Sequence, residues 1–234
     1  MRLYRRLRDL VRPGEAVAVP AETGDSEPAV WEPADEETAM QEVLNTNDPE
    51  EFERSGREQF EALRPLVPSG GVVLDFGCGI GRLARYVAPH CRELWAVDSS
   101  EKMLGFARRR LAALENVRYA RCDGTSIPLP DATLDLAYSV LTLQHMEREH
   151  AFMLLRELHR VIRPGGAVYL TFPNLLSDAY LESFLGYVDG GEVANPRRAR
   201  FYTQQEVERL LPAAGLQIAD CTAGTEIVVV CGPA

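Results

Sequence analysis

The stretch VLDFGCGIGR, residues 73–82, decides the fold of this chain. Residues 72–76 are an apolar run too short for a helix, which predicts a buried strand. Glycines follow at positions 77, 79 and 81, and a helical pattern begins after them. Glycine lacks a Cβ and tolerates positive φ, so such a loop lets a ligand lie against the main chain. We therefore expect a binding loop between a strand and a helix.

Downstream of Gly70 the hydrophobic pattern alternates between short strands and amphipathic helices. The strands are expected at 72–76, 93–97, 117–122, 133–140, 167–172, 216–221 and 226–231. The helices are expected at 81–89, 101–114, 148–162, which R-P-G-G ends, and 204–214, which Thr203 caps. This order predicts an α/β fold: a single Rossmann-like domain with a seven-stranded, mostly parallel sheet and helices on both faces. The last two strands form an antiparallel C-terminal pair, because parallel strands need a longer connection.

The chain has 234 residues, of which 46% are hydrophobic, and this suits one α/β domain with an appendage. Residues 1–48 are interpreted as an N-terminal appendage and linker with short helices that cap the substrate. Residues 49–234 form the domain, with a less regular, lid-like insert at about 173–202. Residues 1–12 are rich in arginine, with apolar residues at helical spacing. They predict either an amphipathic helix that touches a membrane surface or a partner, or a frayed terminal helix.

Charge and cysteine content exclude several classes of protein. The net charge of −10 argues against a general nucleic-acid-binding surface. No apolar run reaches the roughly 18 residues of a membrane span. The five cysteines include no C-x-x-C pair, which indicates neither a disulfide framework nor a zinc site, and a cytoplasmic location is expected. The oligomeric state is left open.

An acidic residue narrows the choice of ligand. Asp98 ends the second predicted strand, twenty-one residues after Gly77, where a carboxylate can accept both hydroxyls of a ribose. Nicotinamide dinucleotides and S-adenosylmethionine both fit this arrangement. The G-x-G-x-G spacing differs from the dinucleotide pattern, and Asp75 would repel a diphosphate. A ligand with an ammonium and a sulfonium group is favoured.

Four ordered blocks resemble the motifs of the class I S-adenosylmethionine-dependent methyltransferases. They are VVLDFGCGIGRLARYVA, AVDSSEKML, CDGTSIPLPDATLDLAYSVLTLQHM and ELHRVIRPGGAVYLTFP. The resemblance runs from about Phe52 to the end of the chain. It implies S-adenosylmethionine as cofactor and a small-molecule methyl acceptor, with O-methylation favoured.

The resemblance also implies roles for individual residues. The backbone at Gly77 and Gly79 would hold the amino-acid part of the cofactor, with Asp75 near its ammonium group through the loop or a water. Asp98 would accept from the ribose hydroxyls. The other cofactor-binding residues would be Ser99 and Met103 beside the adenine, Asp123 and Gly124 bonded to it, Ser139 and Val140 offering backbone oxygen, and Cys78 and Cys122 as lining.

His145, a few residues after the fourth strand, is the best candidate for a general base, with pocket lining as the alternative. The acceptor pocket is expected from the segment around Trp31, from residues 52–57 and from the insert. Its substrate residues would be Tyr180, Tyr187, Arg200 and Tyr202, although these could instead pack a lid. Arginines 197, 198 and 200 either meet an anionic acceptor or balance nearby acids. No metal site is indicated.

Two other functions stay open at this stage. A nicotinamide-dependent oxidoreductase could use the same sheet, with the glycine spacing and Asp75 against it. A non-catalytic module could retain the S-adenosylmethionine site without transferring a methyl group.

Overall fold

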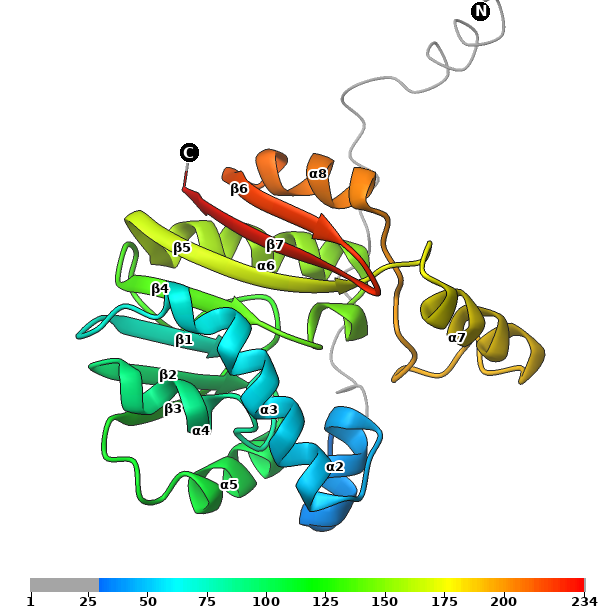
Figure 1. The fold of residues 1–234 in the computed structure, drawn as a ribbon, viewed down its shortest axis with the longest axis horizontal. Coiled ribbons are helices and arrows are strands. Elements are labelled where there is room, and N and C mark those ends of the chain that lie inside the picture. Colours follow the sequence, from blue (N-terminus) through cyan, green and yellow to red (C-terminus); the bar gives the residue numbers. More distant parts are fainter. Residues whose placement is uncertain (1–29, 234) are drawn as a thin grey trace, which may run out of the picture.

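The computed structural model describes residues 30–233. The predicted Arg-rich helix of residues 1–12 and most of the linker lie outside the described residues. The described chain forms a seven-stranded sheet of order β3-β2-β1-β4-β5-β7-β6 (Figure 1). Its strands are β1 (Val72–Phe76), β2 (Glu93–Asp98), β3 (Val117–Arg121), β4 (Leu134–Ser139), β5 (Ile162–Pro173), β6 (Leu216–Ala223) and β7 (Glu226–Pro233).

The sheet has the predicted topology. Strands β1 to β5 pair in parallel, whereas β7 pairs antiparallel with both β5 and β6. The strand order reverses between β1 and β4, which lie side by side. In open α/β sheets this switch point opens a crevice beyond the carboxyl ends of the strands, where ligands bind.

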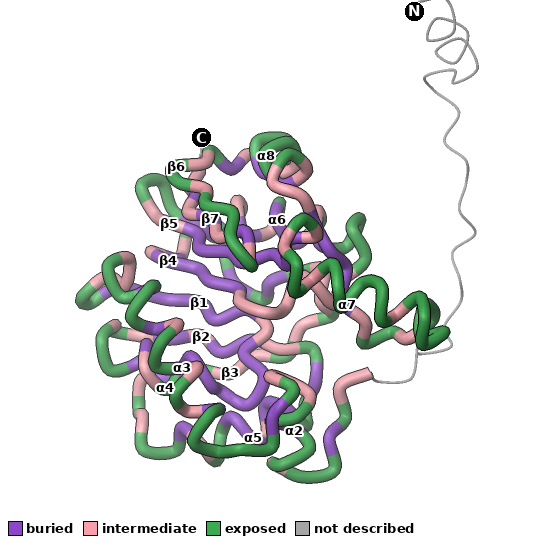
Figure 2. The backbone as a smooth tube through the Cα atoms, turned by 45° about the vertical axis from the view of Figure 1, so that its right-hand side comes forward, coloured by how far each residue is buried: buried purple, intermediate pink, exposed green. Residues whose placement is uncertain are grey.

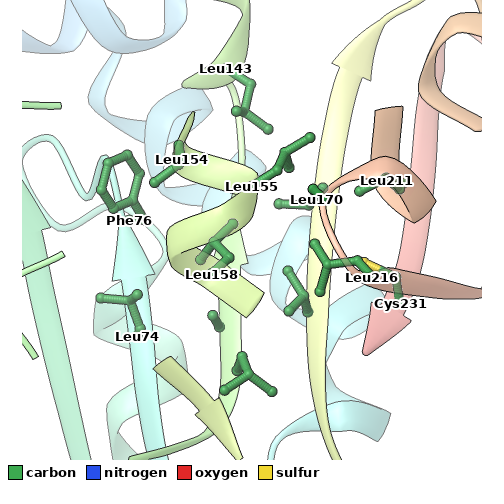
Figure 3. Packing of buried hydrophobic residues seen from close by; sticks show 14 of the residues in the cluster. Leu74, Phe76, Leu143, Leu154, Leu155, Leu158, Leu170, Leu211, Leu216 and Cys231 are labelled. Atoms are coloured by element: carbon green, nitrogen blue, oxygen red, sulfur yellow. The ribbon is translucent and has the colours of Figure 1, made fainter. Parts of the chain in front are cut away.

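Helices cover both faces of the sheet. One buried cluster joins the sheet to α6 (Arg148–Val161) and α8 (Gln204–Ala213) through leucines such as Leu154, Leu158 and Leu211 (Figure 3). A second cluster joins the opposite face to α3 (Pro49–Leu63), α4 (Ala84–Val87) and α5 (Glu101–Arg110). These two apolar layers fix the strand ends and hence the loops that follow them.

Helix α2 (Glu36–Leu44) lies over the glycine loop rather than over the sheet. Its Ala39 and Met40 belong to a third buried cluster, with Ile80 of the loop and Met103 of α5. Asp35 caps the helix by accepting from the Thr38 N–H at 2.8 Å. The appendage therefore packs onto the same edge of the domain as the predicted binding loop.

Three local predictions differ from the structure. Strand β5, expected to begin at residue 167, begins at Ile162 directly after α6, and Ile162 pairs with Leu134 of β4. The R-P-G-G segment therefore lies within β5, where Gly165 has a positive φ. The predicted helix 81–89 is regular only over α4, followed by the 3₁₀ turn Ala88–His90. The insert, expected to be less regular, contains α7 (Asp178–Asp189), capped by Ser177.

Helix α7 buries none of its residues and projects from the domain (Figures 1 and 2). The rings of Tyr180, Phe184 and Tyr187 meet Phe201 at its base. The predicted Thr203 cap of α8 is confirmed, because its hydroxyl accepts from the Glu206 N–H at 3.3 Å. The Glu206 carboxylate bonds Arg148 at 2.5 Å.

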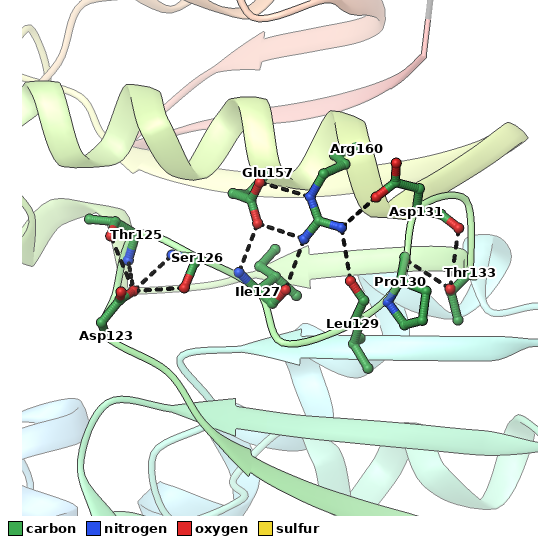
Figure 4. A network of polar contacts seen from close by, with 10 residues as sticks. All are labelled: Asp123, Thr125, Ser126, Ile127, Leu129, Pro130, Asp131, Thr133, Glu157 and Arg160. Carbon is green, nitrogen blue, oxygen red and sulfur yellow. Dashed lines mark hydrogen bonds and ion pairs between the residues drawn. The ribbon is translucent and has the colours of Figure 1, made fainter.

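An arginine in α6 braces the loop between β3 and β4 (Figure 4). Arg160 donates to the carbonyl oxygens of Ile127 and Leu129, both at 2.9 Å, and to the carboxylates of Glu157 and Asp131. Glu157 in turn accepts from the Ile127 N–H at 2.9 Å. The loop that carries Asp123 is thus tied to α6 at several points.

Candidate functional site

A cavity of about 870 Å³ lies at the carboxyl ends of β1 to β4. The loops after these four strands form one part of its wall. The rest comes from residues 30–43 and from residues 193–200 of the insert. One cavity therefore joins the predicted binding loop with two of the segments expected to receive an acceptor, the segment around Trp31 and the insert. Residues 52–57, also expected there, do not line it.

The glycine loop needs its glycines for two separate reasons. Gly77, Gly79 and Gly81 all have positive φ, of 75°, 52° and 83°. A Cβ on Gly77 would lie 2.2 Å from Thr142 Oγ1, and one on Gly81 would lie 2.8 Å from Leu111 Cδ1. Gly77 and Gly79 line the cavity. The loop therefore packs tightly against the domain and exposes backbone to a ligand.

Asp98 lies at the end of β2 and faces the cavity. Its Oδ2 accepts from the Gly79 N–H at 2.9 Å, and its Oδ1 accepts from the Ser100 N–H at 2.9 Å. Burial raises the pKa of the Asp98 carboxyl above its ordinary value. Each carboxylate oxygen can accept more than one hydrogen bond, so both can still accept from a vicinal diol.

The loop after β3 forms the next part of the wall. Asp123 Oδ1 accepts from the backbone N–H groups of Thr125 and Ser126 at 2.9 and 2.8 Å, and these bonds lower the pKa of the Asp123 carboxyl. Gly124, at φ 88°, leaves space around its Cα. Ser99, Met103 and Cys122 also line the cavity. A carboxylate beside open backbone and apolar side chains suits a nucleobase with an amino group.

Three of the predicted cofactor residues do not line the cavity. Asp75 is buried in β1, and burial raises the pKa of its carboxyl to about 7 against the influence of Tyr138 and Arg82. Cys78 is buried behind the loop, and burial raises the pKa of its thiol. The Ser139 hydroxyl donates to the Phe76 carbonyl at 3.0 Å, which ties β4 to β1. Val140, next to it, does line the cavity.

His145 lines the cavity from the 3₁₀ turn Leu143–His145. Its Nδ1 is 3.0 Å from the Arg197 carbonyl, which can only accept, so Nδ1 carries the proton. Its Nε2 is then an acceptor and takes a bond from the Gln144 amide at 3.1 Å. Burial lowers the pKa of His145 to about 4, and Trp31 meets the ring edge-on. The imidazole is neutral with both nitrogens engaged, an arrangement that favours pocket lining over proton transfer.

The residues predicted to bind the acceptor separate into two groups. Arg200 lines the cavity, is 9% exposed, and bonds Glu147 at 2.5 Å and three backbone carbonyls. Tyr180, Tyr187 and Tyr202 do not line it: the first two hold α7 against Phe201, and Tyr202 packs on Phe172. The ion pair of Arg200 with Glu147 and the aromatic contacts of the tyrosines favour the alternative interpretations, charge balance and packing.

Sequence reasoning missed several residues of the cavity wall. Examples are Glu42, Val43, Thr142 and Glu147. Thr142 holds the loop by donating to the Gly77 carbonyl at 3.3 Å. Spacing along the chain could not reveal Glu42, because it reaches the glycine loop only through the packing of α2.

The described residues fit S-adenosylmethionine on their own chemistry. A backbone cradle of left-handed glycines, a carboxylate with spare lone pairs and an acid beside an open glycine lie along one cavity. Within residues 30–233, no three His, Cys, Asp or Glu side chains gather as a metal site. No helix in this part of the chain is long and apolar enough to cross a membrane.

Comparisons with known proteins identify a methyltransferase domain in this chain. Residues 73–166 match a family model described as a methyltransferase domain. The malonyl-[acyl-carrier protein] O-methyltransferase of Pectobacterium atrosepticum is 39% identical over 118 residues, which are 50% of this chain and 44% of that protein. That of Salmonella typhimurium is 43% identical over 100 residues, 42% of this chain and 38% of that protein. The matches thus span less than half of these curated relatives.

Solved structures share the fold. The Pyrococcus horikoshii protein PH0226 superposes with a TM-score of 0.65 at 22% identity, covering 83% of this chain and 96% of that one. The motifs, the sheet order and these matches identify residues 73–166 as a methyltransferase domain of the class I S-adenosylmethionine-dependent kind.

Proposed function

We propose that this chain transfers a methyl group from S-adenosylmethionine to an oxygen atom of a small acceptor. The observation that carries the proposal is the single cavity that joins the glycine loop and Asp98 to a wall built by residues 30–43 and 193–200. The relatives named as O-methyltransferases support it. The antiparallel β6–β7 pair and the methyltransferase match argue against a nicotinamide-dependent oxidoreductase.

When bound, S-adenosylmethionine supplies a methyl group that its sulfonium has already activated for in-line displacement. The chain has to hold the cofactor, align the acceptor and exclude water. Asp98 would take the ribose hydroxyls, Asp123 the adenine amino group, and the backbone of Gly77 and Gly79 the amino-acid part. Trp31 and His145 meet edge-to-face with their ring centroids 4.8 Å apart, and they would exclude water at the acceptor end of the cavity.

The state of His145 favours an acceptor that arrives ionised. A hydroxyl of high pKa benefits from a general base, whereas a carboxylate or an acidic phenol needs none. Using His145 as a base would require breaking its bond from Gln144, and its pKa of about 4 makes it a weak base. The chain therefore suits a carboxylate oxygen better than an alcohol.

The first acceptor to test is the free carboxylate of a short acyl thioester. The named activity of the relatives motivates it, although the family model ends at residue 166, before the insert that lines the acceptor end. Arg198 lines this end as well, and its Nε donates to the Val193 carbonyl at 2.7 Å. No acid among the described residues forms an ion pair with Arg198, so its terminal nitrogens can meet an anion.

The experiment compares malonyl-coenzyme A with acetyl-coenzyme A, which lacks the free carboxylate, using methyl-labelled S-adenosylmethionine. We expect label in a base-labile ester of the malonyl compound and none in the acetyl compound. A panel of carboxylates, phenols and alcohols extends the search for an acceptor. Tight binding of S-adenosylhomocysteine without transfer to any member would support the non-catalytic module instead.

A further inference from the structure

Helix α2 brings an acidic residue to the glycine loop. Ala39 and Met40 pack on Ile80 and Met103, so the residues one helical turn later face the same side. Val43 is close enough that a Cβ on Gly79 would lie 3.1 Å from its Cγ2. Glu42, its neighbour in the chain, lines the cavity. Glu42 is therefore near the loop that would hold the amino-acid part of the cofactor.

Glu42 has one carboxylate oxygen without a donor. Its side chain is only 7% exposed, and it forms an ion pair with Arg197 through Oε1 at 2.9 Å. Its Oε2 is buried and has no hydrogen-bond partner among residues 30–233. Burial raises the pKa of this carboxyl. Leaving a buried carboxylate oxygen unsatisfied is costly, so the geometry points to a donor on a ligand in the cavity.

Arg197 divides its N–H donors between Glu42 and the Val30 carbonyl, so none reaches Glu42 Oε2. Its Nε and Nη2 donate to the Val30 carbonyl at 2.9 and 2.7 Å, and its guanidinium lies over the Trp31 ring at 5.6 Å. The other glutamate on this wall, Glu32, differs because it is 3.0 Å from Lys102 and is more exposed. Glu42 is thus the acid of this segment that is best placed to take a further positive charge.

The carboxylate first expected to face the cofactor's ammonium group does not reach the cavity. Asp75 is buried in β1 and does not line the cavity. The Thr142 hydroxyl has one hydrogen to share between the Gly77 and Val140 carbonyl oxygens, which lie 3.3 and 3.2 Å away, so both carbonyls can still accept from an ammonium group, but they carry no negative charge. The ammonium group carries three N–H donors and a positive charge, which a buried carboxylate oxygen satisfies well.

On the basis of the proposed function, we propose that Glu42 accepts hydrogen bonds from the α-ammonium group of S-adenosylmethionine. Helix α2 is then part of the cofactor site, and not only a cap over the substrate. Because the bond is charge-assisted and shielded from water, removing either partner should weaken binding at least tenfold.

The test is calorimetric titration with S-adenosylhomocysteine and with its des-amino analogue, in which hydrogen replaces the α-amino group. Wild-type protein should bind the parent compound at least tenfold more tightly than the analogue. Glu42→Gln should reduce this ratio of affinities to about twofold or less, because it weakens the binding of the parent compound only. Arg197→Gln breaks the same ion pair but keeps the carboxylate, and Glu32→Gln removes a paired acid nearby, so both should keep the ratio.

The results separate the two proposals. If wild-type protein binds both compounds equally, or if Glu42→Gln keeps the full ratio, the role of Glu42 is overturned. The wild-type comparison does not depend on how well a variant folds, and the unfolding midpoint of each ligand-free variant checks its structure. If wild-type protein binds neither compound, the proposed function itself fails.

Discussion

Asp75 should make the protein less stable as the pH rises. Its carboxyl is buried in β1, and its Oδ2 has no hydrogen-bond partner among the described residues. Folding raises the pKa of this carboxyl from 3.8 to about 7. Each pKa unit corresponds to about 1.4 kcal/mol, so ionising Asp75 destabilises the folded state by ~4 kcal/mol.

The direction follows from proton linkage. The folded state binds the proton more tightly than the unfolded chain, so the stability contributed by protonated Asp75 is full below pH 3.8 and is lost as the pH rises through about 7. Between pH 5 and pH 8 the expected loss in the free energy of unfolding is about 2.5 kcal/mol. Asp75→Asn keeps the size of the side chain but cannot ionise, so it should remove this part of the pH dependence.

The assay is urea denaturation of both proteins at several pH values from 5 to 8, without ligand. The difference between the two profiles cancels the groups they share. Asp220→Asn, at an exposed position in β6, controls for the loss of one charge. Profiles of wild type and Asp75→Asn that stay parallel within about 0.5 kcal/mol would refute the reasoning.

Further substitutions, some paired with a control, test other parts of the structure. Gly77 has φ 75°, and a Cβ there would lie 2.2 Å from Thr142 Oγ1, so Gly77→Ala should lower the free energy of unfolding by about 2 kcal/mol or more in urea denaturation. Adding Thr142→Gly should restore part of that loss. Gly105→Ala in α5, where a Cβ meets nothing within 4 Å, should instead stabilise by about 0.5–1 kcal/mol; a similar loss at both glycines would contradict this account. Asp98→Asn should weaken the binding of S-adenosylhomocysteine at least tenfold, as measured by calorimetry. Unchanged affinity would exclude Asp98 from the site. Arg160→Ala leaves the Leu129 carbonyl unpaired and removes one of the two donors to the Ile127 carbonyl, so it should cost about 2 kcal/mol, against about 0.5 kcal/mol or less for the exposed Arg54→Ala.

The glycine loop and Asp98 could be predicted from the sequence because their signals are local. A five-residue apolar strand, glycines that adopt positive φ and an acid at the end of the next strand follow one another along the chain. The antiparallel terminal pair could also be predicted from a local signal, because a connection of a few residues cannot join two parallel strands. The order of the strands across the sheet was not predicted and comes from the structure.

The rest of the site depends on contacts between distant segments. Glu42 reaches the cavity only because Ala39 and Met40 pack on Ile80 and Met103, and no spacing rule connects these positions. Helix α7 has no buried side, so its apolar residues lack the pattern of a core helix and it was expected to be irregular. The tyrosines of the insert were predicted from residue type alone. In the structure the ring of Tyr180 packs against Phe201, and the ring of Tyr202 packs against Phe172.

The central claim is that the cavity beside Gly77, Gly79 and Asp98 binds S-adenosylmethionine. Titration of the wild-type protein with S-adenosylhomocysteine and, separately, with NADH tests it most directly. The account predicts one site per chain for S-adenosylhomocysteine, with a dissociation constant in the micromolar range, and no heat of binding for NADH. Binding of NADH, or no binding of S-adenosylhomocysteine, would contradict it.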